Sequence, residues 1–283
     1  MASVTKIISN TSQPRGGYLP VSIMEHIQLE DNIFLNPKEN VSPQLVGLVV
    51  DYLSRFIMIC KHWNEFSTSL TGITIQDISD KEAAWSAFSI SLQGARLAEQ
   101  FGHNNTIAIS TNLVSCIKRE LDDDSIINAC KLVSFDAWYR NKLVAARYPL
   151  TYDTISPDKE TIENIRVMVN RSINFFNDYG PITAEGFTFE PDGYTDTVST
   201  GDGDYLTKDT LWDFKVSKSK PSKDDTLQIL MYYIMGKHSG KEEFETIENI
   251  GIFNPRLNTI YKINAASIDK GLIKEIEDNV ICY

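Results

Sequence analysis

The chain contains no long hydrophobic run, and its N-terminus shows no basic segment followed by an apolar one. A membrane-spanning helix needs about 18 consecutive apolar residues, and a secretory signal needs that N-terminal pattern. We therefore expect a cytoplasmic protein with no membrane partner. The chain has 283 residues, of which 42% are hydrophobic and 10% aromatic, so it can bury a substantial core.

Cysteine and histidine are scarce and widely spaced. The four cysteines form no CxxC pair, which argues against a zinc knuckle or a disulfide framework, and we expect buried free thiols at Cys60, Cys116, Cys130 and Cys282. The four histidines show no HxH or HxxxH spacing, and no GxSxG elbow is present. Histidine-metal and serine-hydrolase chemistry are therefore not indicated.

Positive charge is also in deficit. The chain has 27 Lys and Arg residues and 38 Asp and Glu residues, which gives a formal net charge of −11. Repulsion between this surface and phosphate argues against a general polyanion binder. A nucleic-acid site must therefore be a local basic patch.

The first half of the sequence has helical periodicity. Apolar spacing and capping signals predict helices over 42–62, 79–101 and 123–147, the last one broken near Ser134. A polar, proline-bounded connection follows, so we expect a helical N-terminal region over 1–150 and a second domain over 151–283. The helices carry more apolar positions than one stripe requires, which predicts burial against that domain, a second copy or a protein partner.

The second half changes to strand periodicity after a helix that begins at Ser156-Pro157 and ends before Gly180. One more helix is expected over 225–235, and the tract 200–204, which includes Asp202 and Asp204, is expected to be a hairpin turn. Together these elements predict an α/β (α+β) fold in which helices flank a sheet. The expected strands cover 182–189, 194–199, 205–216, 247–253 and 259–263.

Charged side chains cluster on one predicted strand. Asp213 and Lys215 are two residues apart, so they project from the same face of a strand. Asp196 lies on the preceding arm of the expected hairpin, from which both aspartates could reach one pocket. Two carboxylates beside a lysine are a plausible Mg²⁺ site, since Mg²⁺ is usually held by one or two carboxylates plus waters and phosphate oxygens.

Three ordered motifs resemble those of the PD-(D/E)XK nuclease superfamily, in its RecB-type branch. That branch carries GxxD, then (D/E)xK, then QxxxY on the following helix, matched here by Gly193/Asp196, Asp213/Lys215 and Gln228/Tyr232. The resemblance covers roughly residues 157–264. It implies a restriction-endonuclease-like mixed sheet flanked by helices and a divalent-metal-dependent hydrolase that cleaves DNA.

The resemblance also implies roles for individual residues. Asp196, Asp213 and the Phe214 carbonyl would coordinate Mg²⁺ or Mn²⁺, and Lys215 would position or help to activate the attacking water. Gln228 and Tyr232 would orient Lys215 or the nucleic-acid backbone. The family commonly adds one upstream acid, for which the sequence offers three candidates: Glu160, Glu163 and Glu185.

Basic residues that could contact DNA occur in both halves. Lys218, Lys220 and Lys223 follow the proposed catalytic strand and form either a local DNA-binding patch or a solvated loop. The helical half has the same two alternatives for Lys131, Arg140, Lys142 and Arg147. A non-catalytic nucleic-acid- or protein-binding module on the same fold is the alternative to a nuclease.

Overall fold

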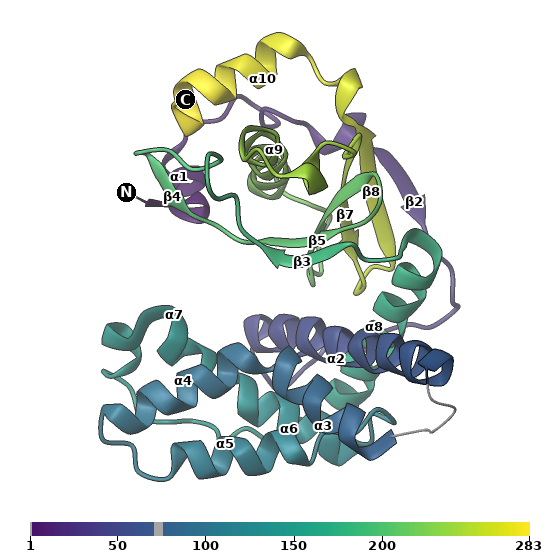
Figure 1. The fold of residues 1–283 in the computed structure, drawn as a ribbon, viewed down its shortest axis with the longest axis vertical. Helices are drawn as coiled ribbons and strands as arrows, with labels where there is room; N and C mark the ends of the chain where they lie inside the picture. The colour runs from purple at the N-terminus through teal and green to yellow at the C-terminus, as the bar shows by residue number, and fades with distance from the viewer. Residues whose placement is uncertain (1, 71–75) are drawn as a thin grey trace. The chain divides into compact units, whose positions relative to one another are not determined.

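The computed structural model describes residues 2–70 and 76–283, with side chains outside 62–79. The chain forms two compact units (Figure 1). A sheet unit comprises residues 1–31 and 174–283, and a helical unit comprises residues 32–173. The boundary expected at residue 150 thus lies inside the helical unit, and the first 31 residues belong with the sheet.

The sheet unit contains a six-stranded mixed sheet, as the sequence predicts. Its strand order is β2-β8-β7-β6-β5-β3. The pair β6–β7 is parallel, and the other neighbouring strands are antiparallel. The bounds are β2 (Glu25–Gln28), β3 (Ala184–Phe187), β5 (Gly203–Leu206), β6 (Thr210–Phe214), β7 (Asn249–Asn254) and β8 (Thr259–Asn264).

Helix α9 (Lys223–His238) connects the parallel strands β6 and β7. It begins with a capping box in which Ser222 and Asp225 each satisfy a backbone amide of the other. Its buried side chains pack into one core with those of β6 and β7, including Leu230, Leu211 and Ile252. This packing determines which face of α9 lies against the sheet.

The other face of the sheet is covered by the end of helix α8 (Lys159–Tyr179). Phe175 lies in parallel stacking on Phe253, with ring centroids 4.1 Å apart, and meets Trp212 edge to face at 4.9 Å. Trp212 therefore points to the α8 face. Because side chains alternate along a strand, its neighbour Asp213 points to the α9 face.

The hairpin in this sheet differs from the sequence-based expectation. The segment expected as one strand over 205–216 is two strands, because Tyr205 of β5 pairs with Trp212 of β6 across a turn closed by Thr207 N–H to Thr210 O (2.9 Å). The expected strand over 194–199 is mostly loop, and the short β4 (Val198–Thr200) pairs in parallel with β1 (Ala2–Ser3). The tract 200–204 is therefore not the hairpin turn, and its end begins β5.

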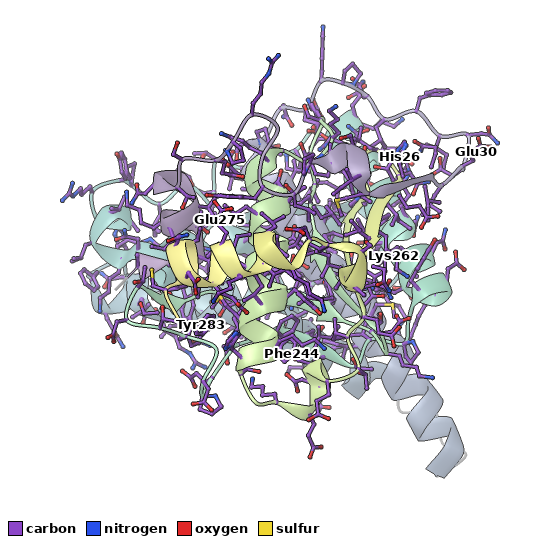
Figure 2. All side chains as sticks on the ribbon, turned by 90° about the horizontal axis from the view of Figure 1, so that it is seen from above. His26, Glu30, Phe244, Lys262, Glu275 and Tyr283 are labelled. Atoms are coloured by element: carbon purple, nitrogen blue, oxygen red, sulfur yellow. The ribbon has the colours of Figure 1, made fainter. Side chains whose placement is uncertain are left out.

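The N-terminal segment contributes elements that the sequence analysis did not find. Strand β2 pairs with β8, where His26 lies opposite Tyr261; Figure 2 labels His26 on β2 and Lys262 on β8. This pairing explains why the first residues belong with the sheet. The remaining elements of the unit are α1 (Val4–Asn10), α10 (Lys270–Ile276), the π-helical turn Glu277–Ile281, and the 3-10 turns Val21–Ile23, Glu242–Phe244 and Ala265–Ser267.

The helical unit is formed by helices, as predicted for this part of the chain. The predicted helix over 79–101 is two helices that break at Phe88, whereas the predicted break near Ser134 is confirmed. The helices are α2 (Pro43–Leu70), α3 (Gln76–Ala87), α4 (Ser89–Gln100), α5 (Thr106–Ser115), α6 (Asp123–Val133), α7 (Asp136–Ala145) and the first part of α8. Within α2, the stretch Pro43–Lys61 is long and apolar enough to cross a membrane by composition, and half of it is buried inside the protein.

A buried polar network joins three helices of this unit. Tyr52 Oη donates to Asp136 Oδ2 (2.6 Å), and Ser91 Oγ donates to Asp136 Oδ1 (2.5 Å). Burial raises the pKa of Asp136, although both hydroxyls and the nearby Arg140 favour its charged form. The carboxylate is thus stabilised by hydrogen bonds in an interior that disfavours its charge.

The cysteines are free thiols, as expected, but only Cys60 and Cys130 are buried. Cys116 and Cys282 are exposed, which corrects the expectation that all four are buried. Cys116 ends α5 and Cys282 follows the last helical turn, so both lie where the chain leaves the core.

Candidate active site

Asp213 is a buried carboxylate near the end of β6. Its side chain is 1% exposed, and its Oδ2 atom lies 3.0 Å from Lys215 Nζ as an ion pair. Oδ2 accepts no hydrogen bond of good geometry. A buried carboxylate oxygen without a hydrogen bond is costly, so this atom is a strong candidate for a ligand.

Lys215 directly follows β6 and continues its pairing with β7, because its amide donates to Phe253 O (2.9 Å). Its Nζ atom also donates to Gln228 Oε1 (3.1 Å) and lies 3.9 Å from Asp225 Oδ1. The ammonium is therefore held between the end of β6 and the first turns of α9.

Gln228 and Tyr232 lie one turn apart on α9. Gln228 Nε2 donates to Tyr232 Oη (2.8 Å), while its Oε1 accepts from Lys215. The four side chains form one continuous polar chain that runs from Asp213 through Lys215 and Gln228 to Tyr232. The structure thus brings together these four residues of the sequence-based prediction.

The charges in this chain influence one another. Burial raises the pKa of Asp213, while the Lys215 ammonium opposes that shift. Burial lowers the pKa of Lys215, but the carboxylates of Asp213, Asp204 and Asp225 outweigh burial and raise it above its ordinary value. Burial, with the charges of Asp213 and Asp204, also raises the pKa of Tyr232. The lysine is accordingly a cation and the tyrosine a neutral phenol.

Asp204 is the second carboxylate at this site. Tyr205 pairs with Trp212 in the β5–β6 hairpin, and this register, continued by one residue, places Asp204 opposite Asp213. Directly opposite residues share a face of the sheet. In addition, Asp204 Oδ2 accepts a hydrogen bond from the Phe214 amide (2.7 Å). Two carboxylates therefore face α9 from neighbouring strands.

Asp196 lies elsewhere, in the loop between β3 and β4, and its side chain is exposed. That loop is fastened to other parts of the sheet unit, since Thr195 Oγ1 donates to Ile281 O (2.6 Å). A Cβ atom on Gly193 would lie 2.4 Å from Met235 O, so this glycine is needed for close packing against α9. The first GxxD motif therefore has a structural explanation, and Asp204, rather than Asp196, is the aspartate that the β5–β6 register places opposite Asp213.

The sequence contains a signal for Asp204 within the tract expected to be a turn. Gly201-Asp202-Gly203-Asp204 is also a GxxD motif, and its aspartate is the second residue of β5. A Cβ atom on Gly201 would lie 2.7 Å from Val4 Cγ2, so this position too requires a glycine. Local spacing cannot distinguish the two motifs, because Asp196 falls on the expected strand over 194–199 and Asp204 directly precedes the one expected over 205–216.

The three upstream glutamates are placed differently. Glu160 and Glu163 lie in the part of α8 that belongs to the helical unit, where Glu163 forms an ion pair with Arg166. Glu185 lies on β3 opposite Tyr205, so it shares the face on which Tyr205 meets Phe176. Among the side chains that the structure describes, those of residues 2–61 and 80–283, no group of three or more His, Cys, Asp or Glu is placed to hold a metal ion.

The residues present nevertheless fit Mg²⁺ or Mn²⁺. Asp204 and Asp213 supply hard carboxylate oxygens, one of them buried and without a hydrogen bond. Mg²⁺ is commonly held by one or two carboxylates and keeps several waters, so a third side chain is not required. The Phe214 carbonyl remains a predicted ligand on the same strand.

The predicted basic run lies in the loop between β6 and α9. Lys218, Lys220 and Lys223 are all exposed, the last as the first residue of α9. Asn254 Nδ2 donates to Ser217 O (2.8 Å) and thereby holds this loop against the end of β7. The run thus begins three residues after Lys215, at the same end of the sheet.

No family model, no curated protein and no solved structure matches the chain. Function is therefore inferred from the chemistry of the site. Two carboxylates can hold a divalent cation, a fixed ammonium can stabilise negative charge, and acceptor oxygens of Gln228 and Asp225 on α9 keep that ammonium in place. These are the parts that hydrolysis of a phosphate ester requires.

Proposed function

We propose that the protein is a divalent-metal-dependent nuclease that hydrolyses DNA phosphodiester bonds. One arrangement carries the proposal. Asp204 lies opposite Asp213, and Asp213 begins a continuous series of polar contacts that runs through Lys215 and Gln228 to Tyr232. Along the chain, α8 is followed by the sheet strands β3, β5 and β6, then α9, then β7, with the short β4 of a second sheet inserted after β3. This order, with β6 and β7 parallel, supports a relationship to the PD-(D/E)XK nucleases.

In this proposal Asp204 and Asp213 hold the metal, together with the Phe214 carbonyl. A bound Mg²⁺ or Mn²⁺ would lower the pKa of a coordinated water and neutralise charge on the phosphate. Asp204 takes the role that the sequence analysis gave to Asp196. The hydrogen bond from the Phe214 amide keeps its carboxylate aimed at the end of β6.

Lys215 acts on the phosphate and on the attacking water. An ammonium has three donors and no acceptor, so it can orient a water lone pair and stabilise negative charge on phosphate oxygens. Gln228 accepts from Lys215 and is itself fixed by Tyr232, so both are positioning residues. The exposed lysines of the 217–222 loop and of the α9 start would attract the DNA backbone.

The proposal is tested with purified full-length protein on linear and circular DNA. Cleavage is expected with Mg²⁺ or Mn²⁺, and none with EDTA. Metal binding is followed separately by thermal unfolding, because an ion that binds only the folded protein raises its Tm. Asp213→Asn should lose both the cleavage and the metal-dependent rise in Tm.

Two results would contradict the nuclease proposal. Cleavage that persists in EDTA would show that the site is not needed, and so would an Asp213→Asn variant as active as the wild type. A third result would favour the alternative function. If Mn²⁺ raises the Tm of the wild type but not that of Asp213→Asn, and neither DNA nor RNA is cleaved, the protein is a non-catalytic binding module instead of a nuclease.

A further inference from the structure

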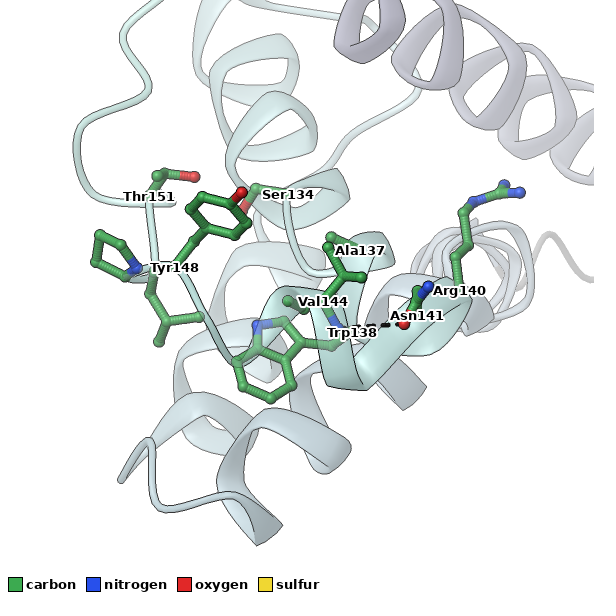
Figure 3. Close-up of a pocket in the computed structure, with 11 residues that line it drawn as sticks. Ser134, Ala137, Trp138, Arg140, Asn141, Val144, Tyr148 and Thr151 are labelled. Atoms are coloured by element: carbon green, nitrogen blue, oxygen red, sulfur yellow. Dashed lines mark hydrogen bonds between the residues drawn. The ribbon is translucent and has the colours of Figure 1, made fainter.

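The helical unit contains a cavity that the proposed active site does not use. It has a volume of about 320 Å³ and lies between α7 and the segment 148–151 (Figure 3). Volumes of about 300–1,000 Å³ are typical of small-ligand sites. Trp138, Arg140, Val144 and Tyr148 are among the residues that line the cavity.

Helix α7 is kinked at the cavity. Asn141 has non-helical backbone angles (φ −156°, ψ 80°), and its Oδ1 accepts from the Val144 amide (3.2 Å), which restarts the helix (Figure 3). The chain then turns through Tyr148 and Pro149, so the cavity is lined by the two sides of this bend and is open to solvent. Trp138, which is 3% exposed, lines the cavity and makes an edge-on contact with His103 at 4.9 Å.

Large apolar side chains are exposed around this cavity. Tyr148 is 66% exposed and Leu143 is 67% exposed, and Tyr139 and Val144 are exposed as well. These four lie within ten residues, although exposed large hydrophobics are few in the rest of the chain that the structure describes. Such a patch marks an interaction site more often than a solvated surface.

The same segment is basic in an acidic protein. Residues 131–151 contain Lys131, Arg140, Lys142 and Arg147 against a single acid, the buried Asp136, whereas the whole chain carries −11. No ion pair involves Lys142 or Arg147 in the described parts of the chain. Cations that lack acidic partners, beside exposed aromatic rings, suit a ligand with flat rings and an anionic backbone.

We propose that this cavity binds a base of single-stranded DNA, with Tyr148 as the stacking platform and Lys142 and Arg147 as contacts to phosphates. A duplex keeps its bases stacked on one another and offers none to the cavity, so the site selects single strands. The choice of nucleic acid rests on the proposed nuclease function. Binding itself does not need the metal site.

The experiment measures binding of the full chain in EDTA to a fluorescent single strand of about 20 nucleotides and to the matching duplex, by anisotropy. Tyr148→Ala should weaken single-strand binding about 5- to 100-fold, which is the usual effect of removing the platform for one stacked base, and should leave duplex binding unchanged. Tyr148→Phe retains the ring and should bind like the wild type. Phe34→Ala is the matched control, because Phe34 is also an exposed aromatic ring of the helical unit (97% exposed) but does not line the cavity.

Charge is tested in the same assay. The double variant Lys142→Gln/Arg147→Gln should reduce the log–log salt slope by up to about 1.4, since each single-strand phosphate that a cation neutralises contributes about 0.7. Asp213→Asn should bind single strands normally even if it abolishes cleavage, which separates this proposal from the nuclease proposal. Single-strand binding equal in Tyr148→Ala and the wild type would overturn the inference. Self-association that depends on Tyr148, without strand binding, would assign the cavity to a second copy and overturn it too.

Discussion

The Phe214 amide donates a 2.7 Å hydrogen bond to Asp204 Oδ2 across the β5–β6 hairpin. This bond is made by the residue that follows Asp213, so it ties the carboxylate of one strand to the end of the other. Cross-strand neighbours share a face, and both carboxylates act on the charge of Lys215. The relationship identifies Asp204 as the partner of Asp213, and it makes the role of Asp204 separable from that of Asp196 by experiment.

Replacing Asp204 should abolish catalysis, and replacing Asp196 should not. Asp204→Asn removes one carboxylate from the proposed metal site, and we expect metal-dependent cleavage to fall by about 100-fold or more, because metal stabilisation of the transition state is worth several kcal/mol. Asp196→Asn is the control, since its side chain is exposed in the loop between β3 and β4. Initial cleavage rates measure both. The reverse order of effects would return the second ligand to Asp196.

Tyr232 should affect the rate more than the affinity for DNA. Tyr232→Phe removes the acceptor for Gln228 Nε2, which costs about 1 kcal/mol for one hydrogen bond and lowers kcat by about fivefold. KM for DNA and the Mn²⁺-dependent rise in Tm should not change. Tyr233→Phe is the matched control, because Tyr233 contacts Lys237 instead. A KM effect with normal kcat would show that Tyr232 binds DNA.

The basic run after β6 should account for part of the salt dependence of DNA binding. Changing Lys218, Lys220 and Lys223 together to Ala should flatten the log–log slope by up to about 0.9 for each duplex phosphate that these lysines neutralise, or about 0.7 for single strands. Lys274→Ala, an exposed lysine on α10 that pairs with Asp278, serves as control. An unchanged slope in the triple variant would identify the run as a solvated loop.

The four thiols should fall into two reactivity classes. Burial raises the pKa of Cys130 to about 12, and burial with the charge of Asp80 raises the pKa of Cys60 to about 12. Neither forms thiolate at neutral pH, whereas Cys116 and Cys282 are exposed. A disulfide reagent should therefore modify two thiols rapidly in the native protein and all four in denaturant, as absorbance titration and peptide mass analysis can show. Rapid native labelling of Cys130 would contradict the burial of α6.

The stability of the helical unit should depend on the ionisation of Asp136. Its pKa is raised in the folded protein, so ionisation costs stability at pH values above that raised pKa, and the cost disappears as the pH falls through it. Asp136→Asn carries no such cost. The loss of stability caused by this substitution should therefore be smaller at neutral pH than near the ordinary carboxyl pKa of about 3.9, in urea unfolding at both pH values. The opposite trend would mean that the hydroxyls of Tyr52 and Ser91 outweigh burial.

Local spacing was enough to predict much of the candidate site. Residues two apart on a strand share a face, which places Asp213 with Lys215, and residues four apart on a helix share a face, which places Gln228 with Tyr232. The structure shows both pairs as expected and joins them through a 3.1 Å hydrogen bond. The class of fold followed in the same way from the change of period between the two halves.

The tertiary structure alone decided which residues lie opposite one another across strands. Two GxxD motifs lie on or directly before expected strands, and only the hairpin turn at 207–210 shows that Asp204, rather than Asp196, faces Asp213. Likewise, the pairing of β2 with β8 joins residues more than 200 positions apart and assigns the N-terminal segment to the sheet unit. The physical reason is that side-chain direction along one element is set by local backbone geometry, whereas strand register is set by turns and by the core that forms only when distant segments meet.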